Sequence, residues 1–192
     1  MNLPAFPPSA LAWHIKGASR IFCWMVSQAV GATLAGLLLM HPVASLAHTL
    51  TGEVVGIADG DTLTLLDTTK TQHKIRLAGI DAPEKIQAFG ERSKQNLAGL
   101  VFRKQVTVEW SKLDRYGRVI GKVLLESEDM CLAQVRAGLA WHYKAYEREQ
   151  SRVDRERYAQ AEDEARQSRR GLWRDPSPTP PWDFRHSRKK RH

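Results

Sequence analysis

Cysteine is scarce in this chain of 192 residues, which contains only Cys23 and Cys131. Two cysteines cannot build the multi-bridge framework that stabilises small secreted domains. The C-x2-C and H-x3-H spacings of structural zinc sites are also absent, which excludes a zinc finger or zinc ribbon. We expect Cys131 to be a small buried residue on an apolar helix face, and the alternative is a reactive lone thiol.

The central part of the chain has almost no net charge. The formal net charge of the whole chain is +8, with 29 basic and 21 acidic residues. Two of the basic residues precede residue 48 and five follow residue 184, which leaves 22 between these points beside all 21 acidic residues. Bulk charge therefore does not indicate a nucleic-acid-binding protein. Any phosphate recognition has to come from the local placement of basic side chains.

Residues 1–47 have the pattern of an export signal. Two basic residues precede an apolar run over residues 21–40, and Ser45 and Ala47 supply the small residues of a cleavage site. We expect cleavage directly after Ala47. A run of about 20 apolar residues also suffices to span a bilayer, so an uncleaved membrane anchor is the alternative. Either way the rest of the chain is exported, to the periplasm or the medium, and it contacts the membrane only if the anchor is retained.

Residues 175–192 are predicted to form a proline-rich, basic and disordered tail. Four prolines occur within residues 175–183, and such a segment favours extended backbone that does not join a core. The basic residues that follow have two interpretations, a solvated chain end or a segment attracted to polyanions or anionic lipid.

Residues 48–174 are predicted to form the folded domain. Strands are expected where apolar residues alternate or cluster between turn signals, and helices where they recur at helical spacing. The expected strands are 50–57, 62–66, 73–77, 106–110 and 119–125, and the expected helices are 89–103, 130–140 and 150–169. Five strands with an interposed helix indicate an α+β fold, a five-stranded OB-type β-barrel with about three packed helices.

Four charged segments stand out in this domain: Asp59 to Thr62 (DGDT), Arg76, Asp81 to Glu84 (DAPE) and Asp114 to Arg118 (DRYGR). Each has an ordinary structural explanation when taken alone. Asp-Gly favours a hairpin turn, Arg76 suits an exposed strand position, DAPE resembles a helix N-cap with its capping-box partner, and DRYG is typical of a turn.

Taken together, these segments resemble the staphylococcal nuclease (thermonuclease) family. The matching stretches are VGIADGDTLTL, KIRLAGIDAPE, LDRYGRVIGKV, AGLAWHY and ARQSRRGLW, and they extend from about residue 51 to residue 173. The resemblance implies an OB barrel with packed helices. It also implies a calcium-dependent phosphodiesterase that cleaves DNA and RNA with little sequence preference.

The resemblance assigns a calcium site to Asp61, Asp81 and Ala82. The two aspartates supply carboxylate ligands, and Ala82 supplies its backbone carbonyl at a position where the well-studied family member has threonine. A backbone ligand survives that change. The chemistry agrees, since Ca²⁺ is a hard cation that binds carboxylate, carbonyl and water oxygens.

The resemblance assigns the phosphate chemistry to Arg76, Arg118 and Glu84. The two arginines grip the scissile phosphate, and Glu84 acts on the attacking water either as a general base or by orienting it. In-line attack with departure of the 5′ oxygen leaves 3′-phosphate ends. Paired guanidinium donors match phosphate oxygens and stabilise the charge that develops in the transition state. Tyr116 either donates a hydrogen bond to the phosphate or packs within its turn.

Two other classes of function compete with this hypothesis. The first is a non-catalytic OB-fold module that binds nucleic acid. A pure binder has no physical reason to place a carboxylate cluster beside its phosphate site, because the cluster repels the ligand without a metal. The second is an envelope interaction protein whose apolar segment and basic tail are the working parts. We expect a monomer with no obligate protein partner.

Overall fold

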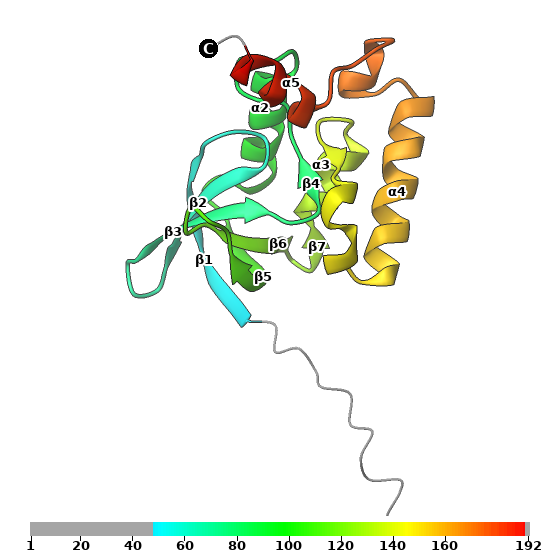
Figure 1. Cartoon of the computed structure of the whole chain (residues 1–192). Coiled ribbons are helices and arrows are strands. Elements are labelled where there is room, and N and C mark those ends of the chain that lie inside the picture. Colours follow the sequence, from blue (N-terminus) through cyan, green and yellow to red (C-terminus); the bar gives the residue numbers. More distant parts are fainter. Residues whose placement is uncertain (1–47, 191–192) are drawn as a thin grey trace, which may run out of the picture. The chain divides into compact units, whose positions relative to one another are not determined.

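The structure, a computed structural model, describes residues 48–190 (Figure 1). The predicted export signal over residues 1–47 lies outside this described part. Within residues 48–190, no helix has both the length and the apolar character needed to cross a membrane.

Five strands form a closed barrel, as the sequence predicted: β1 (His48–Ile57), β2 (Thr62–Asp67), β3 (Gln72–Leu77), β5 (Gln105–Leu113) and β6 (Val119–Leu125). They are hydrogen-bonded in the order β3-β2-β1-β5-β6, each pair antiparallel. A parallel pairing of β3 with β6 closes the barrel, with Arg76 opposite Ile120. The register is interrupted between Val54 and Gly56 in β1 and between Trp110 and Lys112 in β5. Such bulges increase the twist that closure requires.

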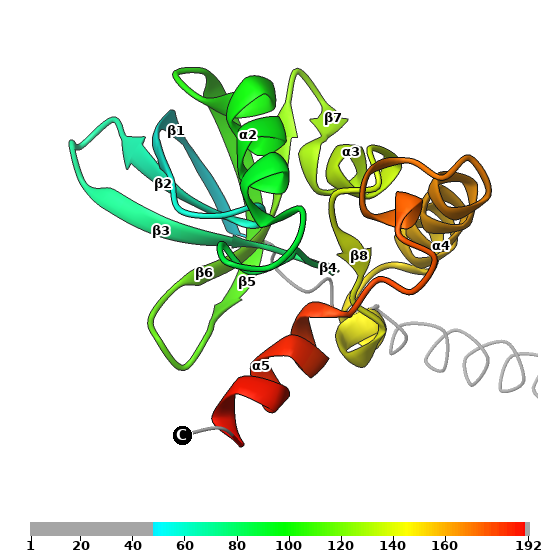
Figure 2. The same ribbon diagram turned by 90° about the horizontal axis from the view of Figure 1, so that it is seen from above.

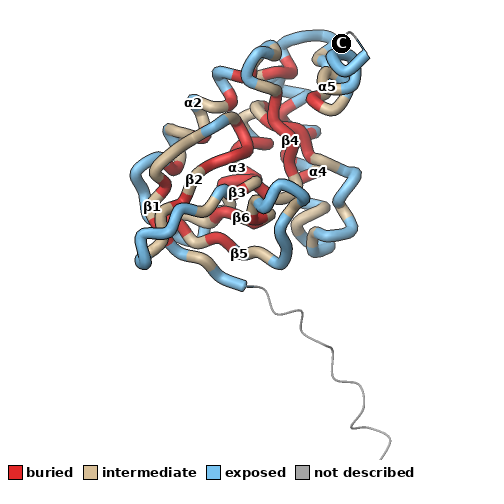
Figure 3. Tube along the Cα trace, turned by 60° about the vertical axis from the view of Figure 1, so that its left-hand side comes forward, coloured by how far each residue is buried: buried red, intermediate tan, exposed pale blue. Residues whose placement is uncertain are grey.

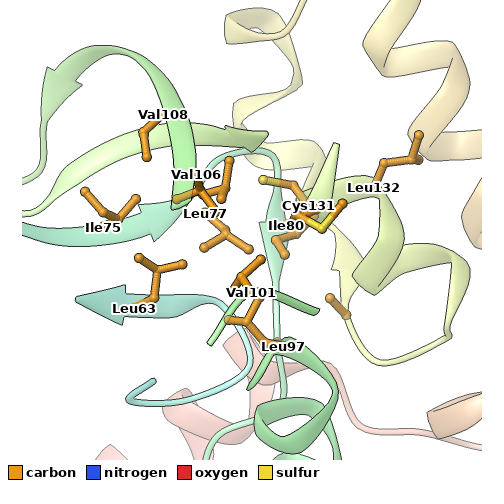
Figure 4. Close-up of a cluster of buried hydrophobic side chains, with 14 of the residues drawn as sticks. Leu63, Ile75, Leu77, Ile80, Leu97, Val101, Val106, Val108, Cys131 and Leu132 are labelled. Carbon is orange, nitrogen blue, oxygen red and sulfur yellow. The ribbon is translucent and has the colours of Figure 1, made fainter. Parts of the chain in front are cut away.

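The barrel interior is filled by apolar side chains (Figure 4). Alternation explains their placement, since every second residue of β6 from Val119 to Val123 is buried while its neighbours are only partly covered. Helix α2 (Gly90–Val101) closes one end of the barrel with Leu97 and Val101, which are fully buried. Cys131 is fully buried in the same core, which agrees with its interpretation as a packed residue.

Helices α3 (Met130–Arg136) and α4 (Arg152–Gln167) pack beside the barrel. Both begin at an N-cap residue of a preferred type: the Asp129 side chain accepts from a backbone N–H of α3, and the Ser151 side chain accepts from a backbone N–H of α4. Helix α3 ends earlier than the sequence predicted. Gly138 follows it with φ +66°, and an added Cβ there would lie 2.3 Å from the Arg170 carbonyl oxygen, so the chain turns away at a close backbone contact.

Short elements connect these parts: β4 (Ile80–Asp81), β7 (Glu128–Asp129), β8 (Trp141–His142) and two 3₁₀ helices, η1 (Lys144–Glu149) and η2 (Gly171–Arg174). Strand β4 pairs antiparallel with β8. This pairing attaches the segment after β3 to the segment that follows α3. Residues 80–83 are buried without interruption (Figure 3).

The tail does not match the prediction of disorder, because residues 181–189 form helix α5 (Pro181–Lys189). Pro181 is its first residue, a position where the missing N–H costs nothing. The ring centroid of Trp182 lies 5.6 Å from that of Trp141 and 5.5 Å from that of Tyr143. These aromatic contacts attach α5 to the domain and outweigh the extended preference of the prolines before it. Figure 2 shows α5 in red beyond the end of β4.

Candidate active site

One cavity of about 820 Å³ brings together all seven residues that the sequence singled out: Asp61, Arg76, Asp81, Ala82, Glu84, Tyr116 and Arg118. They come from the β1–β2 turn, β3, β4, the segment after β4 and the β5–β6 hairpin. The closure of the barrel is what unites them, because β3 and β6 are neighbours only through their parallel pairing.

The β1–β2 turn presents Asp61 to the cavity. Its backbone N–H donates to Asp59 Oδ1 at 3.0 Å, a local bond that tightens the turn. The Asp61 carboxylate is buried and accepts from Thr62 Oγ1 at 3.1 Å and from the backbone N–H of Ala82 at 2.7 Å. The last bond fixes the β1–β2 turn to the segment that carries Asp81.

Arg76 bridges the two buried aspartates. Its Nη2 donates to Asp81 Oδ1 at 2.9 Å, and its Nη1 lies 2.5 Å from Asp61 Oδ2. The Nη1 contact is an ion pair without hydrogen-bond alignment, so this buried nitrogen has no satisfactory hydrogen-bond acceptor. Burial lowers the pKa of Arg76, but Asp61 and Asp81 raise it by more, and the guanidinium stays charged.

Two acidic groups of the cavity, Asp59 and Asp81, have raised pKa values despite this arginine. Burial raises the pKa of Asp59 to about 6, with Asp61 adding to the effect. Burial also raises the pKa of Asp81, and the ion pairs with Arg185 and Arg76 do not fully offset it. Burial thus disfavours the charged form of both carboxylates, and a further cation bound beside them would favour that form.

These donors fit a hard divalent cation with few protein ligands. The described residues contain no group of three or more His, Cys, Asp or Glu side chains arranged around one point. Coordination would depend on the Asp61 and Asp81 carboxylates, the Ala82 carbonyl and water, which is the all-oxygen set that Ca²⁺ accepts. A bound cation would stabilise the Asp81 carboxylate, whose pKa burial raises, and a phosphate oxygen would accept from the buried Nη1 of Arg76, which has no hydrogen-bond acceptor.

Glu84 lies in the segment after β4, with 38% of its side chain exposed. Its backbone N–H donates to Gln87 Oε1, and its carbonyl accepts from the Gln87 N–H. The alternative explanation of DAPE as a capping box is wrong, because the next helix begins only at Gly90, after Phe89 with φ 65°. The carboxylate is thus free of a helix-capping role, and its Oε1 instead accepts from Arg185 Nη1 at 2.8 Å.

The β5–β6 hairpin positions Arg118. Asp114 Oδ1 accepts the backbone N–H groups of Tyr116 and Arg118, both at 2.9 Å, and Gly117 supplies the positive φ that the turn needs. Arg118 Nε donates to Asp114 Oδ2 at 2.7 Å, which leaves both Nη groups available for an anion. Burial raises the pKa of Asp114, but the hydrogen bonds from Arg118 and Tyr116 outweigh it, and the net pKa is lowered.

Tyr116 does not pack into the protein interior, since it is 69% exposed. The guanidinium carbons of Arg115 and Arg118 lie 4.8 and 5.5 Å from its ring centroid. An exposed aromatic ring beside two arginines is a suitable surface for an unstacked base.

Sequence analysis missed a buried polar network beneath the β1–β2 turn. Gln134, fully buried on α3, donates from Nε2 to the Gly60 carbonyl at 2.6 Å and to the Ser93 carbonyl at 3.1 Å. Its Oε1 accepts from Asn96 at 2.5 Å. The only sequence signal was a polar residue among the apolar neighbours of a helix face. This network holds the backbone directly before Asp61.

Sequence analysis also missed Arg185, which it placed in the tail. In the structure Arg185 enters the cavity and contacts Asp81 and Glu84. The aromatic residues Trp182 and Phe184, unusual in a solvated tail, were the available signal that this segment packs.

Comparison with known proteins agrees with the geometry. Residues 74–175 match the family described as "Staphylococcal nuclease homologue". The chain is 39% identical over 170 residues to a protein named "Micrococcal nuclease" from Shigella flexneri, covering 84% of this chain and 94% of that protein. It is 42% identical over 163 residues to "Protein ParB" from Escherichia coli, covering 80% and 88%. It is 40% identical over 158 residues to a protein named "Uncharacterized endonuclease" from Haemophilus influenzae, covering 81% of this chain and 85% of that protein. The chain therefore belongs to the staphylococcal nuclease homologue family and is a hydrolase of phosphodiester bonds.

Proposed function

We propose that this chain is an exported, calcium-dependent nuclease that cleaves DNA and RNA with little sequence preference and leaves 3′-phosphate ends. The observation that carries the proposal is one cavity in which two arginines, a buried pair of aspartates and a partly exposed glutamate converge. The chain supplies a phosphate grip, an oxygen-lined cation site and a carboxylate for water within the same space.

Arg76 and Arg118 hold the phosphate from β3 and from the residue before β6, the two strands whose parallel pairing closes the barrel. Arg76 is prepositioned by its ion pairs with Asp61 and Asp81, and Arg118 by its Nε bond to Asp114. Both arginines are therefore oriented before substrate arrives, which reduces the reorganisation needed in the transition state. Removal of one such donor typically costs about 10²–10³ in rate.

Asp61, Asp81 and the Ala82 carbonyl would hold calcium, which supplies Lewis-acid neutralisation of the phosphate charge when bound. Glu84 then accepts a proton from the attacking water or orients it by a hydrogen bond. The water attacks phosphorus in line, the bond to the 5′ oxygen breaks, and the phosphate remains on the 3′ oxygen. The leaving oxygen takes a proton from solvent.

Weak sequence preference follows from the kinds of contact available. The side chains of the site contact a phosphate and the face of a base. Contacts of these two kinds do not distinguish one base pair from another, because they do not involve the base edges. Export is supported by the pattern of residues 1–47 and by chemistry, because the millimolar calcium found outside cells suits a site with few protein ligands.

The direct test is cleavage of plasmid DNA, single-stranded DNA and RNA by the purified protein, with Ca²⁺ and with EGTA. Asp61→Ala and Glu84→Gln should each lose at least about 10²-fold in rate. Glu91→Gln, an exposed acid in the first turn of α2, is the matched control and should cleave normally. The new ends should carry 5′ hydroxyls that accept a labelled phosphate from a kinase without prior dephosphorylation.

Two outcomes would contradict the proposal. DNA binding without cleavage under any divalent cation would favour the non-catalytic module. Cleavage that survives both Asp61→Ala and Glu84→Gln would place the chemistry elsewhere. Fractionation of producing cells tests export separately, since retention of the protein in the cytoplasm would refute it.

A further inference from the structure

Helix α5 delivers an arginine into the acidic part of the cavity. Arg185 Nη2 donates to Asp81 Oδ2 at 2.7 Å, and its Nη1 donates to Asp81 Oδ1 at 3.2 Å and to Glu84 Oε1 at 2.8 Å. A guanidinium that spans one carboxylate and reaches a second is the strong, directional form of an ion pair. These two acids are the ones proposed to bind calcium and to act on water.

These contacts use the oxygen atoms that a cation needs. Both oxygens of Asp81 accept from guanidinium groups, Oδ1 from Arg76 and Arg185 and Oδ2 from Arg185. A divalent ion at Asp81 would have to share lone pairs with Arg185 and would meet its positive charge at short range. Binding of the cation and binding of Arg185 at Asp81 therefore oppose each other.

The position of Arg185 is fixed by packing at the start of α5, one helical turn earlier. Pro181 is buried, and Trp182 contacts Trp141 and Tyr143. The Gln87 side chain donates to the carbonyl of Thr179, just before the helix, at 2.6 Å. The first turn of the helix thus anchors it to the domain, and Arg185, three positions after Trp182 on the same face, contacts the acids.

We propose that Arg185 is a resident competitor for the divalent cation and sets the metal affinity of this site. Without a bound cation, Arg185 neutralises Asp81 and Glu84 and keeps these two carboxylates from repelling each other. The cation binds only when Arg185 leaves these oxygens. This inference rests on the proposed calcium site, and the variants below separate the two.

The test is isothermal titration of the purified protein with Ca²⁺ at physiological ionic strength. Arg185→Gln should lower the Kd for Ca²⁺ by at least about tenfold, because removal of a charged partner from buried carboxylates changes binding strongly. Arg188→Gln removes the same charge from an exposed position of the same helix and should change the Kd by about twofold or less. Arg185→Lys keeps the charge but cannot span both acids, so its Kd should lie between those of the wild type and Arg185→Gln.

The readouts distinguish this inference from its rivals. The Ca²⁺ concentration for half-maximal cleavage should fall in parallel with the Kd, while the rate at saturating Ca²⁺ stays unchanged. An Arg185→Gln protein that binds Ca²⁺ no more tightly than the wild type overturns the competition. A large loss of rate at saturating Ca²⁺ also overturns it and makes Arg185 a phosphate ligand. If no variant binds Ca²⁺, the proposed calcium site itself fails and the inference fails with it, whereas equal affinities refute the inference alone.

Discussion

Replacement of Gln134 by leucine tests whether the network under the β1–β2 turn holds the site in place. Gln134 is fully buried, and its Nε2 donates to the carbonyls of Gly60 and Ser93. Leucine has nearly the same volume but no donor, so both bonds are lost without a cavity. The Gly60 carbonyl has no other hydrogen bond among residues 48–190 and would stay buried and unsatisfied.

The size of the effect follows from these contacts. The Gly60 carbonyl, which loses its donor, costs about 1–3 kcal/mol, whereas the Ser93 carbonyl lies inside α2 and keeps its helical backbone donor. Burial of the apolar leucine side chain stabilises the folded state by about 1 kcal/mol. Asn96, which donates to Gln134, is only partly buried and can turn to water. We expect the free energy of unfolding to fall by about 1–3 kcal/mol.

Urea unfolding at pH 7, followed by tryptophan fluorescence, measures this loss. At an unchanged m-value the midpoint should fall by about 1 M or more. Gln95→Leu is the matched control, because Gln95 lies exposed on α2 and bonds only to Glu91 on the same helix. A second readout is Ca²⁺ affinity, which should weaken because Asp61 follows directly after the released Gly60. A midpoint for Gln134→Leu equal to that of the control would show that the network does not stabilise the turn.

Three further predictions concern other parts of the molecule. Arg118→Lys should lose about 10²-fold in kcat/KM for DNA with little change in Tm, since lysine lacks the paired donors for phosphate; retained activity would remove Arg118 from the phosphate grip. Trp182→Ala should loosen α5 and tighten Ca²⁺ binding in calorimetry toward the value for Arg185→Gln, while unchanged binding would mean that packing does not position the arginine. Asp67→Asn should lower the Tm at pH 7, because hydrogen bonds from Thr69 and His73 hold the pKa of Asp67 well below its usual range. A carboxylate with a depressed folded-state pKa stabilises the protein above about pH 4, so this Tm difference should shrink as the pH falls below about 3, and a constant difference would contradict the assignment.

The sequence predicted the barrel strands, and it singled out residues that line one cavity, because both follow from local patterns. Each barrel strand carries alternating or clustered apolar residues between turn signals, and Arg76, Asp81 and Glu84 lie within nine consecutive positions. Tight turns such as Asp114 to Arg118 fix their own geometry through side chain to backbone bonds, so their form follows from a few residues.

The parts that the sequence did not predict depend on contacts between distant segments. Trp182 anchors α5 against Trp141, 41 positions earlier in the chain, and no local pattern reveals that pair. The prolines before α5 indicated an extended tail, although a proline at the first helical position was equally compatible with a helix start. The hydrogen bond from Gln134 to Gly60 depends on the packing of α3 beneath the β1–β2 turn, which no local pattern around Gln134 indicates.

The parallel pairing of β3 with β6 has a consequence for folding. It joins Arg76 to Ile120 across 44 residues and is non-local, so its loop-closure entropy has to be overcome before the contact contributes stability. Until it forms, Arg76 and Arg118, the two arginines proposed to bind the phosphate, belong to separate hairpins. A chain whose hairpins are complete but whose barrel is open thus has native-like secondary structure and no active site. Recovery of cleavage during refolding should therefore lag behind recovery of the far-ultraviolet circular dichroism signal. The rate at which cleavage recovers would then measure how fast the barrel closes.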